Sequence, residues 1–483
     1  MRKTQIRINF GTDGFRGVIG DSFTFDAVKR VSASLAAFIK GKSPAGSGNS
    51  YSSSIAIGYD TRFLSKEFAL SAATAINSAG IKVIFSRDFC PSPVLSYFVK
   101  KNKCEAGVMV TASHNPFMFN GIKFKSPYGS SMLQKDVRII EKIANGDSPL
   151  SGEGKSRDVI NIKDFKKDYV RHLIDFTGLE NKKGAAGRIE VVFDPMFGAG
   201  IGYLPAILKK TGIRHTSINN KLNPLFPGIN PEPIDINLSR LKSIVKMKGK
   251  ENRFAVGFAM DGDADRIGAV DSSGNFMDSH KIFSIILYYL LKSGKSGNVV
   301  KTVSVSNSIN DICERFNVKL FEVPIGFKNV AELMIGNKNN ILMGGEESGG
   351  IGIASHMPER DGILMSLMLI KIMKEWNKNL SELLNEVFGR PYPYVYIRKD
   401  LHLSEEKKDI LIGKLKKSVF NLPFKSEIVS RNFIDGFKYI YKDGSWLLIR
   451  PSGTEPLLRV YAESADKNKP EKLILAVEKE LET

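Results

Sequence analysis

The sequence has few cysteines and no hydrophobic run long enough to cross a membrane. Its three cysteines, Cys90, Cys104 and Cys313, form no Cys-x-x-Cys pair, which argues against a zinc site or a disulfide framework. We expect three reduced thiols in a cytoplasmic protein. The longest apolar run, residues 363–373, contains Lys371 and is much shorter than the ~20 residues of a membrane span. We therefore expect a buried helix there and no membrane association.

Acidic residues are also scarce relative to basic ones: the chain has 51 acidic and 70 basic residues, and its formal net charge is +19. A basic surface can bind nucleic acid through phosphates, and a basic cleft can attract small phosphorylated molecules. The lysines are scattered, and no zinc-finger spacing, RNA-binding aromatic pattern or basic amphipathic run is present. We therefore expect no nucleic-acid partner, and a phosphorylated small molecule is the better hypothesis.

A similar pattern occurs three times along the 483 residues. A short apolar strand ends in a polar loop, and a helix-like stretch and a β-branched run follow it. The three first strands are SIAIGYDTR (54–62), IEVVFDPMFGAG (189–200) and KTVSVSNSIN (301–310). Strands that alternate with helical segments predict α/β units with buried sheets. After residue 390, short strands and helices alternate in a different pattern, which predicts a smaller C-terminal domain.

Each of the three units then has one more apolar strand that runs directly into an unusual loop. The loops are TASHNP (111–116), DGDADR (261–266) and GGEESGG (344–350). In open α/β sheets, ligands gather beyond the carboxyl ends of the strands, so these loops predict three walls of one site. We predict four domains, at residues 1–158, 159–275, 276–390 and 391–483.

The loop DGDADR has aspartates at alternate positions, namely Asp261, Asp263 and Asp265. Three neighbouring carboxylates repel one another unless a cation joins them, and oxygen ligands suit Mg²⁺ or Ca²⁺. An EF-hand is excluded because its sixth and twelfth positions hold Arg266 and Ser272. Mg²⁺ shared with a substrate phosphate fits the loop best, and a solvated acidic turn is the alternative.

Ser113 in TASHNP has three interpretations. A helix cap before Pro116 is disfavoured because the following segment, 117–124, contains an Asn-Gly turn and a strand-like run. A hydrolase pair with His114 is disfavoured because adjacent residues rarely fold back on each other and no G-x-S-x-G elbow is present. A serine that carries a phosphoryl group near a carboxylate-held metal remains.

Three further loops offer groups that suit anions or sugars, although each is also compatible with an ordinary turn or hairpin. GTDGFRG (11–17) combines Arg16 with glycines whose backbone N–H groups can approach an anion. RPSGTEP (450–456) combines arginine, hydroxyl groups and free backbone amides, which can hold a phosphate. GGEESGG offers Glu346 and Ser348, which suit hydrogen bonds to sugar hydroxyls.

TASHNP, DGDADR, GEESGG and RPSGTEP occur in the order and at roughly the spacing found in the α-D-phosphohexomutases, and GTDGFRG strengthens the match. The resemblance covers essentially the whole chain. It implies a heart-shaped enzyme with three related α/β domains, whose sheets are mixed, and a smaller α+β C-terminal domain. It also implies transfer of a phosphoryl group between two positions of a hexose, through phosphoserine, Mg²⁺ and a hexose 1,6-bisphosphate.

The resemblance also implies roles for individual residues. Ser113 resembles the phosphoserine, which would share the Mg²⁺ with Asp261, Asp263 and Asp265. Arg16 and Lys123 resemble the catalytic cations, and Lys123 resembles the acid/base. His356 resembles a histidine that some members place near the sugar, and a structural role is the alternative. The implied substrate contacts are Arg266, Lys328, Glu346, Ser348, Arg450, Ser452, Gly453, Thr454 and Arg459.

The resemblance does not determine which hexose is the substrate. GEESGG matches neither the aromatic residue of many glucose-type members nor the histidine that many glucosamine-type and dual glucose/mannose members have at the position of Gly350. Glu347 argues mildly against the glucosamine enzyme, so we expect a phosphoglucomutase or phosphomannomutase, as a monomer or homodimer. The alternatives are a phosphoglucosamine mutase, a non-catalytic phosphosugar-binding relative and a phosphatase that hydrolyses its phosphoserine.

Overall fold

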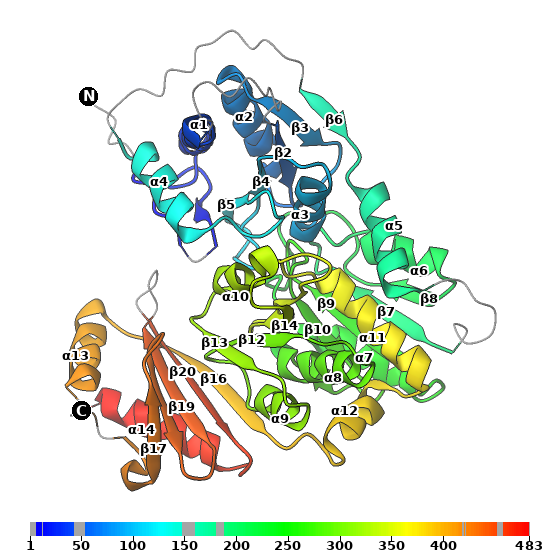
Figure 1. Ribbon diagram of the computed structural model, residues 1–483, viewed down its shortest axis with the longest axis vertical. Coiled ribbons are helices and arrows are strands. Elements are labelled where there is room, and N and C mark those ends of the chain that lie inside the picture. The colour runs from blue at the N-terminus through cyan, green and yellow to red at the C-terminus, as the bar shows by residue number, and fades with distance from the viewer. Residues whose placement is uncertain are drawn as a thin grey trace.

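Four β-sheets follow one another along the chain (Figure 1). The computed structural model describes residues 6–11, 13–42, 54–146, 160–179, 188–417, 420, 422–451 and 457–482. We name the four sheets with their helices units 1 to 4.

Unit 1 contains a six-stranded sheet. Its strands are β1 (Phe15–Val18), β2 (Ser54–Tyr59), β3 (Lys82–Ser86), β4 (Ala106–Val110), β5 (Phe119–Lys125) and β6 (Asn161–Lys163). Its helices are α1 (Phe25–Lys42), α2 (Ser65–Ser78), α3 (Ser92–Lys101) and α4 (Gln134–Ala144). Strand β6, which lies beyond the boundary predicted at residue 158, pairs with β3.

Unit 2 contains a five-stranded sheet. Its strands are β7 (Glu190–Asp194), β8 (Arg214–Ser217), β9 (Ala255–Met260), β10 (Ile267–Val270) and β11 (Phe276–Met277). Its helices are α5 (Lys166–Thr177), α6 (Tyr203–Lys210), the short 3-10 helix η1 (Asp235–Leu238) and α7 (Ser239–Gly249).

Unit 3 contains a four-stranded sheet. Its strands are β12 (Asn298–Thr302), β13 (Leu320–Val323), β14 (Ile341–Gly345) and β15 (Ile351–Ile353). Its helices are α8 (Ser279–Lys292), α9 (Ser308–Arg315), α10 (Phe327–Met334), the short η2 (Ile335–Asn337), α11 (Gly362–Trp376) and α12 (Leu380–Phe388).

Unit 4 is a five-stranded antiparallel sheet with order β16-β20-β19-β18-β17. Its strands are β16 (Val395–His402), β17 (Ile428–Asn432), β18 (Phe437–Tyr441), β19 (Trp446–Pro451) and β20 (Leu457–Ser464). Its helices are α13 (Glu405–Lys416), the short η3 (Lys425–Glu427) and α14 (Lys469–Glu482).

The same strand order recurs in units 1 to 3: β5-β4-β2-β3, β10-β9-β7-β8 and β15-β14-β12-β13. In each, three strands are parallel and the strand at one end pairs antiparallel with its neighbour. This recurrence confirms the predicted fold class of three related α/β units with mixed sheets and a smaller α+β unit.

Units 1, 2 and 3 share one large hydrophobic core, to which α3, α5, α8 and α11 all contribute. Helix α11 confirms the buried helix predicted over residues 363–373, and its apolar side chains are buried on nearly all sides. The Asp361 carboxylate caps this helix by accepting from the Leu364 N–H (2.9 Å).

The three cysteines are buried and unpaired. Within the described residues, none of the helices has both the length and the hydropathy that crossing a membrane requires.

Candidate active site

Ser113 lies three residues beyond the end of β4, in a loop that is hydrogen-bonded to a residue just after the neighbouring strand β2. Its φ is +52°, a conformation that L-residues rarely adopt, and its N–H donates to Thr111 Oγ1 (2.9 Å). The buried guanidinium of Arg62, which follows β2, donates to the Ser113 carbonyl (2.6 Å) and to three more carbonyls between residues 115 and 119. Arg62 therefore fixes the loop conformation that presents the Ser113 hydroxyl.

The Ser113 hydroxyl points from unit 1 to the acidic loop of unit 2. Its Oγ donates to Asp261 Oδ2 (2.7 Å) and lies 3.4 Å from His114 Nδ1. The two loops are in direct backbone contact, because a Cβ on Gly262 would lie 2.2 Å from the Ser113 carbonyl oxygen. The carboxylate, and not the adjacent imidazole, is thus the closer partner of the serine.

Asp261, Asp263 and Asp265 are completely buried, and one carboxylate oxygen from each lies within 4.8 Å of the other two. Burial and the charges of Asp265 and Asp263 raise the pKa of Asp261 well above its usual value. Asp263 Oδ1 and Asp265 Oδ1 accept no hydrogen bond from the described residues. Buried carboxylate oxygens without a hydrogen bond are costly, and an oxygen-preferring divalent cation would satisfy them, so this donor set fits Mg²⁺.

The ammonium group of Lys123, on β5, lies among three carboxylates. Its Nζ lies 2.6 Å from Asp263 Oδ2 and 3.2 Å from both Asp265 Oδ2 and Asp13 Oδ2. Burial disfavours the ammonium, but these three carboxylates outweigh it and raise the pKa of Lys123 above its usual value. Conversely, burial favours the neutral form of Asp263, but the Lys123 charge holds the pKa of Asp263 below its usual value.

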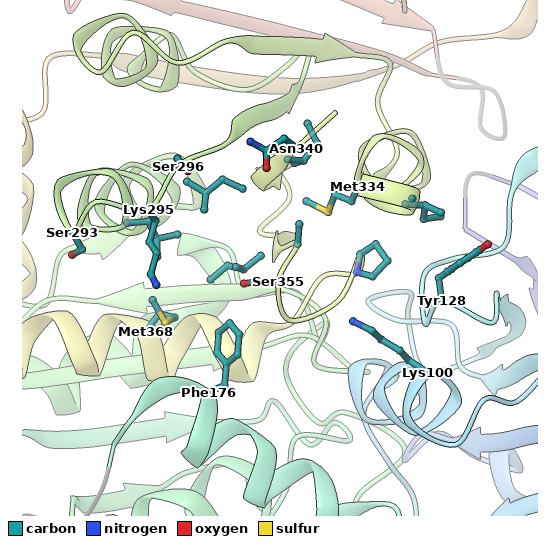
Figure 2. A pocket seen from close by; sticks show the side chains of 18 of the residues that line it. Lys100, Tyr128, Phe176, Ser293, Lys295, Ser296, Met334, Asn340, Ser355 and Met368 are labelled. Carbon is teal, nitrogen blue, oxygen red and sulfur yellow. The ribbon is translucent and has the colours of Figure 1, made fainter. Parts of the chain in front are cut away.

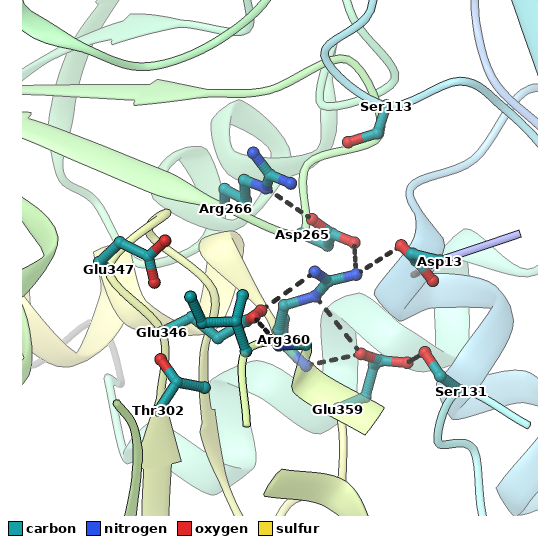
Figure 3. A network of polar contacts seen from close by, with 12 residues as sticks. Asp13, Ser113, Ser131, Asp265, Arg266, Thr302, Glu346, Glu347, Glu359 and Arg360 are labelled. Atoms are coloured by element: carbon teal, nitrogen blue, oxygen red, sulfur yellow. Dashed lines mark hydrogen bonds and ion pairs between the residues drawn. The ribbon is translucent and has the colours of Figure 1, made fainter. Parts of the chain in front are cut away.

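Arg360, just before α11, links three units through one side chain (Figure 3). Its Nη2 lies 2.7 Å from Asp265 Oδ2 and 2.8 Å from Asp13 Oδ2. Its Nη1 lies 3.3 Å from Glu346 Oε2, and its Nε lies 3.7 Å from Glu359 Oε1. With Asp13 from unit 1, Asp265 from unit 2 and Glu346 from unit 3, Arg360 is the central cation of this network.

The glycine-rich loop after β14 is joined to the acidic loop, because Arg266 and Gly350 form an isolated β-bridge. Glu346 in this loop accepts from the Gly326 N–H (3.0 Å). Burial raises the pKa of Glu346 to about 7. Ser348 is half-buried in the same loop. The structure therefore brings together the three loops that follow β4, β9 and β14.

Two more predicted cations lie at the edge of this cluster. Arg16 Nη1 donates to Asn115 Oδ1 (2.6 Å), and its Nη2 lies 3.9 Å from Asp13 Oδ2. Lys328, at the start of α10, lines a small pocket together with Asp13 and Lys123. Both residues thus lie beside the carboxylate network.

His356 has a different environment from the cluster. Its Nδ1 lies 2.9 Å from His172 Nε2, and its Nε2 lies 3.0 Å from Asp361 Oδ2. The Tyr169 hydroxyl also donates to Asp361 (2.8 Å). The imidazole of His356 therefore packs in a buried junction with α5 and the start of α11, and its hydrogen bonds are those expected of a structural histidine.

The phosphate loop predicted in unit 4 is only partly described. Ser452, Gly453 and Thr454 lie outside the described residues. Arg450 and Arg459 lie opposite each other on β19 and β20. Within unit 4, Arg450 Nε donates to Asp435 Oδ1 (2.9 Å) and Arg459 Nε lies 3.7 Å from Asp400 Oδ2. The part of unit 4 that is described thus brings two of the predicted phosphate-binding residues together.

Three residues of the network were not predicted from the sequence: Asp13, Arg62 and Arg360. Asp13 belongs to GTDGFRG and Arg62 to the polar end of SIAIGYDTR, and both segments were noted without these residues being singled out. The position of Arg62 just beyond a buried strand was a usable signal. Arg360 lies between two other charged residues in ERD, and nothing in that context distinguishes it from a surface arginine.

Comparison with known proteins covers nearly the whole chain. Sequence models of the phosphoglucomutase/phosphomannomutase family match its alpha/beta/alpha domains I, II and III at residues 7–150, 167–274 and 278–390, and its C-terminal domain at residues 406–480.

Individual relatives agree with this match. A probable phosphoglucosamine mutase of Methanosphaera stadtmanae is 31% identical over 94% of both chains, and a phosphoglucomutase/phosphomannomutase of Thermococcus kodakarensis is 28% identical over 95% of both. The crystal structure of a putative phosphomannomutase from Thermus thermophilus superimposes with a TM-score of 0.83, at 29% identity and 99% coverage of both chains. The chain therefore belongs to the phosphoglucomutase/phosphomannomutase, or α-D-phosphohexomutase, family of isomerases.

Proposed function

We propose that the protein interconverts the 1-phosphate and 6-phosphate of glucose, of mannose or of both, with Ser113 as the phosphoryl carrier. The observation that carries this proposal is the position of the Ser113 hydroxyl, 2.7 Å from a carboxylate of a buried acidic triad. His114 is a poor general base for a Ser-His hydrolase pair, because burial and the neighbouring arginines lower its pKa well below the usual value. The serine is well placed to carry a phosphoryl group that a divalent cation and several protein cations neutralise.

Asp261, Asp263 and Asp265 would hold Mg²⁺ together with a phosphoryl oxygen on Ser113. When bound, Mg²⁺ supplies positive charge to the phosphoryl oxygens and fixes the orientation of the group. Lys123 and Arg16 would add protein charges to that of the metal. Burial disfavours the charged form of each and neighbouring carboxylates favour it, and for Lys123 the carboxylates prevail and raise the pKa.

In the proposed reaction, a hydroxyl of the hexose phosphate attacks the phosphorus on Ser113. The bond between phosphorus and Ser113 Oγ breaks as the bond to the sugar oxygen forms. The proton that the sugar hydroxyl loses is passed to Ser113 Oγ, and Lys123 is the proposed acid/base for this exchange. The hexose 1,6-bisphosphate then turns around, and its other phosphoryl group returns to Ser113. Holding both groups in line supplies most of the catalysis.

The remaining proposed substrate contacts divide between the two ends of the sugar. Glu346 and Ser348 would accept and donate hydrogen bonds to sugar hydroxyls, with Arg266 and Lys328 beside the reacting phosphate. Arg450, Ser452, Gly453, Thr454 and Arg459 would bind the phosphate that is not reacting.

The space beside Glu346 is filled by Arg360. Arg360 Nη1 lies 3.3 Å from Glu346 Oε2, and a Cβ on Gly350 would lie 2.3 Å from Arg360 Cδ. The arginine therefore occupies the space beside Glu346 into which a side chain at position 350 would extend. Support for a neutral sugar comes from Glu347, since many glucosamine-type members have glutamine at this position.

The test is a comparison of kcat/KM for the 1-phosphates of glucose, mannose and glucosamine, each assayed with a trace of its 1,6-bisphosphate. We expect glucose or mannose to exceed glucosamine by about 10-fold or more, about 1.4 kcal/mol of transition-state binding. Release of inorganic phosphate in place of the 6-phosphate would identify a phosphatase. Binding without turnover of any of the three would identify a non-catalytic relative.

Phosphoglucosamine mutase is the second candidate, because relatives with that name are about as similar to this chain as those named for glucose and mannose. A higher kcat/KM for glucosamine 1-phosphate than for the two neutral sugars would favour it.

A further inference from the structure

A second cavity lies where units 1, 2 and 3 meet (Figure 2). Its volume is about 800 Å³, and it is lined by α3, the turn after β5, the end of α5 and a large part of unit 3. This volume falls within the roughly 300–1,000 Å³ of small-molecule sites. Its lining contains none of the residues that we assigned to the candidate active site, so the cavity is a separate feature of the molecule.

The lining of this cavity is positively charged. It includes Lys100, Lys295 and Lys371 and, among the described residues, no aspartate or glutamate. Lys371 is partly neutralised by Glu375, whose Oε1 lies 3.5 Å from its Nζ. Lys100 donates to the His356 carbonyl (2.7 Å), and the ion pairs of the described residues include neither Lys100 nor Lys295. These two lysines lie on opposite sides of the cavity in Figure 2.

Between the two lysines the walls are largely apolar. Phe176 from α5 and Met334 from α10 lie on different sides of the cavity, and Met368 from α11 forms part of its floor (Figure 2). Met334 and Met368 are almost completely buried, so these walls are supported by the core. Methionine and phenylalanine bind flat apolar groups well, and methionine adapts its shape to them.

We propose that this cavity is an effector site for a small organic anion that has an apolar, preferably aromatic, body. The anionic group would pair with Lys295, and the apolar body would extend from there across Phe176, Met334 and Met368 towards Lys100, whose positive charge adds to the field of the cavity. A cationic ligand is disfavoured by the three lysines, and a purely polar anion would leave the apolar walls unmatched. This ligand class differs from the sugar phosphates proposed for the active site.

The elements that line the cavity continue directly into the proposed active site. Tyr128 follows β5, which carries Lys123. Helix α10 has Lys328 in its first turn, beside the active site, and ends at Met334 in the cavity. The segment 355–360 contributes Ser355 and Pro358 to the cavity and Arg360 to the carboxylate network. Occupancy of the cavity would therefore bias the positions of three active-site cations, and only this coupling rests on the proposed function.

The binding test uses 8-anilino-1-naphthalenesulfonate, an aromatic anion whose fluorescence rises on transfer to an apolar site. We expect saturable binding at one site of the full-length protein. Lys295→Glu should weaken it by about 10-fold or more, because an attraction is replaced by a repulsion. Lys209→Glu makes the same charge change at an exposed lysine of α6 outside the cavity and should bind like the wild type. Equal binding by the two variants, or the absence of a saturable site, would overturn the proposal.

If circular dichroism shows that Lys295→Glu is misfolded, Lys100→Gln replaces it, with the same expected direction. The coupling is tested by repeating the titration at increasing glucose 1-phosphate, once calorimetry has established that the sugar phosphate binds. Coupled sites predict an apparent Kd that changes and then reaches a plateau, since the coupling free energy is finite and reciprocal. A Kd that rises without limit would place the probe in the active site, and an unchanged Kd would contradict the effector role.

Discussion

Ser113 Oγ donates a 2.7 Å hydrogen bond to Asp261 Oδ2, although 148 residues separate the two in the sequence. The bond joins the loop after β4 of unit 1 to the loop after β9 of unit 2, so the relative position of two units determines it. It sets the hydroxyl beside a donor set that fits Mg²⁺, and the buried ammonium of Lys123 lies 2.6 Å from another carboxylate of that set. The phosphoryl transfer that we propose for Ser113 would therefore depend on residues that hold the units together as well as on those that contact substrate.

Gly262→Ala is expected to lower kcat by about 100-fold, because the added Cβ would lie 2.2 Å from the Ser113 carbonyl oxygen and force the two loops apart. Steady-state kinetics at saturating substrate measure this. The control is Gly413→Ala in α13, where no atom lies within 4 Å of the added Cβ and alanine favours the helix. Similar kcat values for the two variants would show that the close approach is unimportant.

Arg360→Ala is expected to cost about 3–5 kcal/mol of stability and most of the activity. The substitution leaves the buried carboxylates of Asp265 and Glu346 and the partly buried carboxylate of Asp13 without the cation that all three share. Urea unfolding measures the loss. Arg253→Ala removes an exposed arginine that pairs with Glu382 and should cost less than about 1 kcal/mol. A loss from Arg360→Ala no larger than that of the control would contradict the central position of Arg360.

Asp261→Asn is expected to abolish the rise in melting temperature that Mg²⁺ produces in the wild type. At about 100 times its Kd, a ligand that binds only the folded state contributes about 2.7 kcal/mol. Without metal, the variant should be at least as stable as the wild type, because burial and two neighbouring aspartates raise the pKa of Asp261. Thermal unfolding with Mg²⁺ and with chelator tests both statements, and Asp235→Asn at an exposed aspartate is the control. Full activity of the wild type in chelator would refute the metal site.

His172 predicts a pH dependence of stability. Burial, and then the neighbouring His356, lower its pKa to about 4 in the folded protein, whereas an unfolded histidine titrates near ~6.5. Between these values only the unfolded chain binds the proton, so the free energy of unfolding falls as the pH falls from about 6.5 towards 4. Because His172 is only half-buried, we expect a loss of about 1–2 kcal/mol between pH 7.5 and pH 5.

His172→Gln should remove most of this particular loss, as measured by urea unfolding at the two pH values. His215→Gln, at a half-buried histidine of β8 outside the histidine pair, is the matched control. If both variants lose stability with acid as the wild type does, His172 is not the titrating group.

Most of the fold and the centre of the site followed from local patterns. Alternating strands and helices predicted the three related units, and carboxylates at alternate positions predicted the triad of Asp261, Asp263 and Asp265. These features can be recognised because each lies within one short segment. Once the strands were recognised, the general rule that ligands bind beyond their carboxyl ends was enough to bring the three loops together.

What could not be predicted depends on contacts between units. The guanidinium of Arg360 has partners in units 1, 2 and 3, and its neighbours in sequence indicate none of them. The ring nitrogens of His356 bond to His172, 184 residues away, and to Asp361, and the sequence around His356 indicates no contact with α5. The periodicity of apolar residues predicts which side chains are buried, but it does not predict which buried polar groups contact one another.

The most direct test of the mechanism is to identify the residue that becomes phosphorylated. The wild-type enzyme, first treated with substrate to remove bound phosphate, is incubated with glucose 1,6-bisphosphate and Mg²⁺, then digested and analysed by mass spectrometry. We predict one phosphoryl group on the peptide that contains Ser113, and neither phosphorylation of that peptide nor mutase activity in Ser113→Ala. Phosphorylation of another residue, or undiminished mutase activity in Ser113→Ala, would contradict the proposal that Ser113 carries the phosphoryl group.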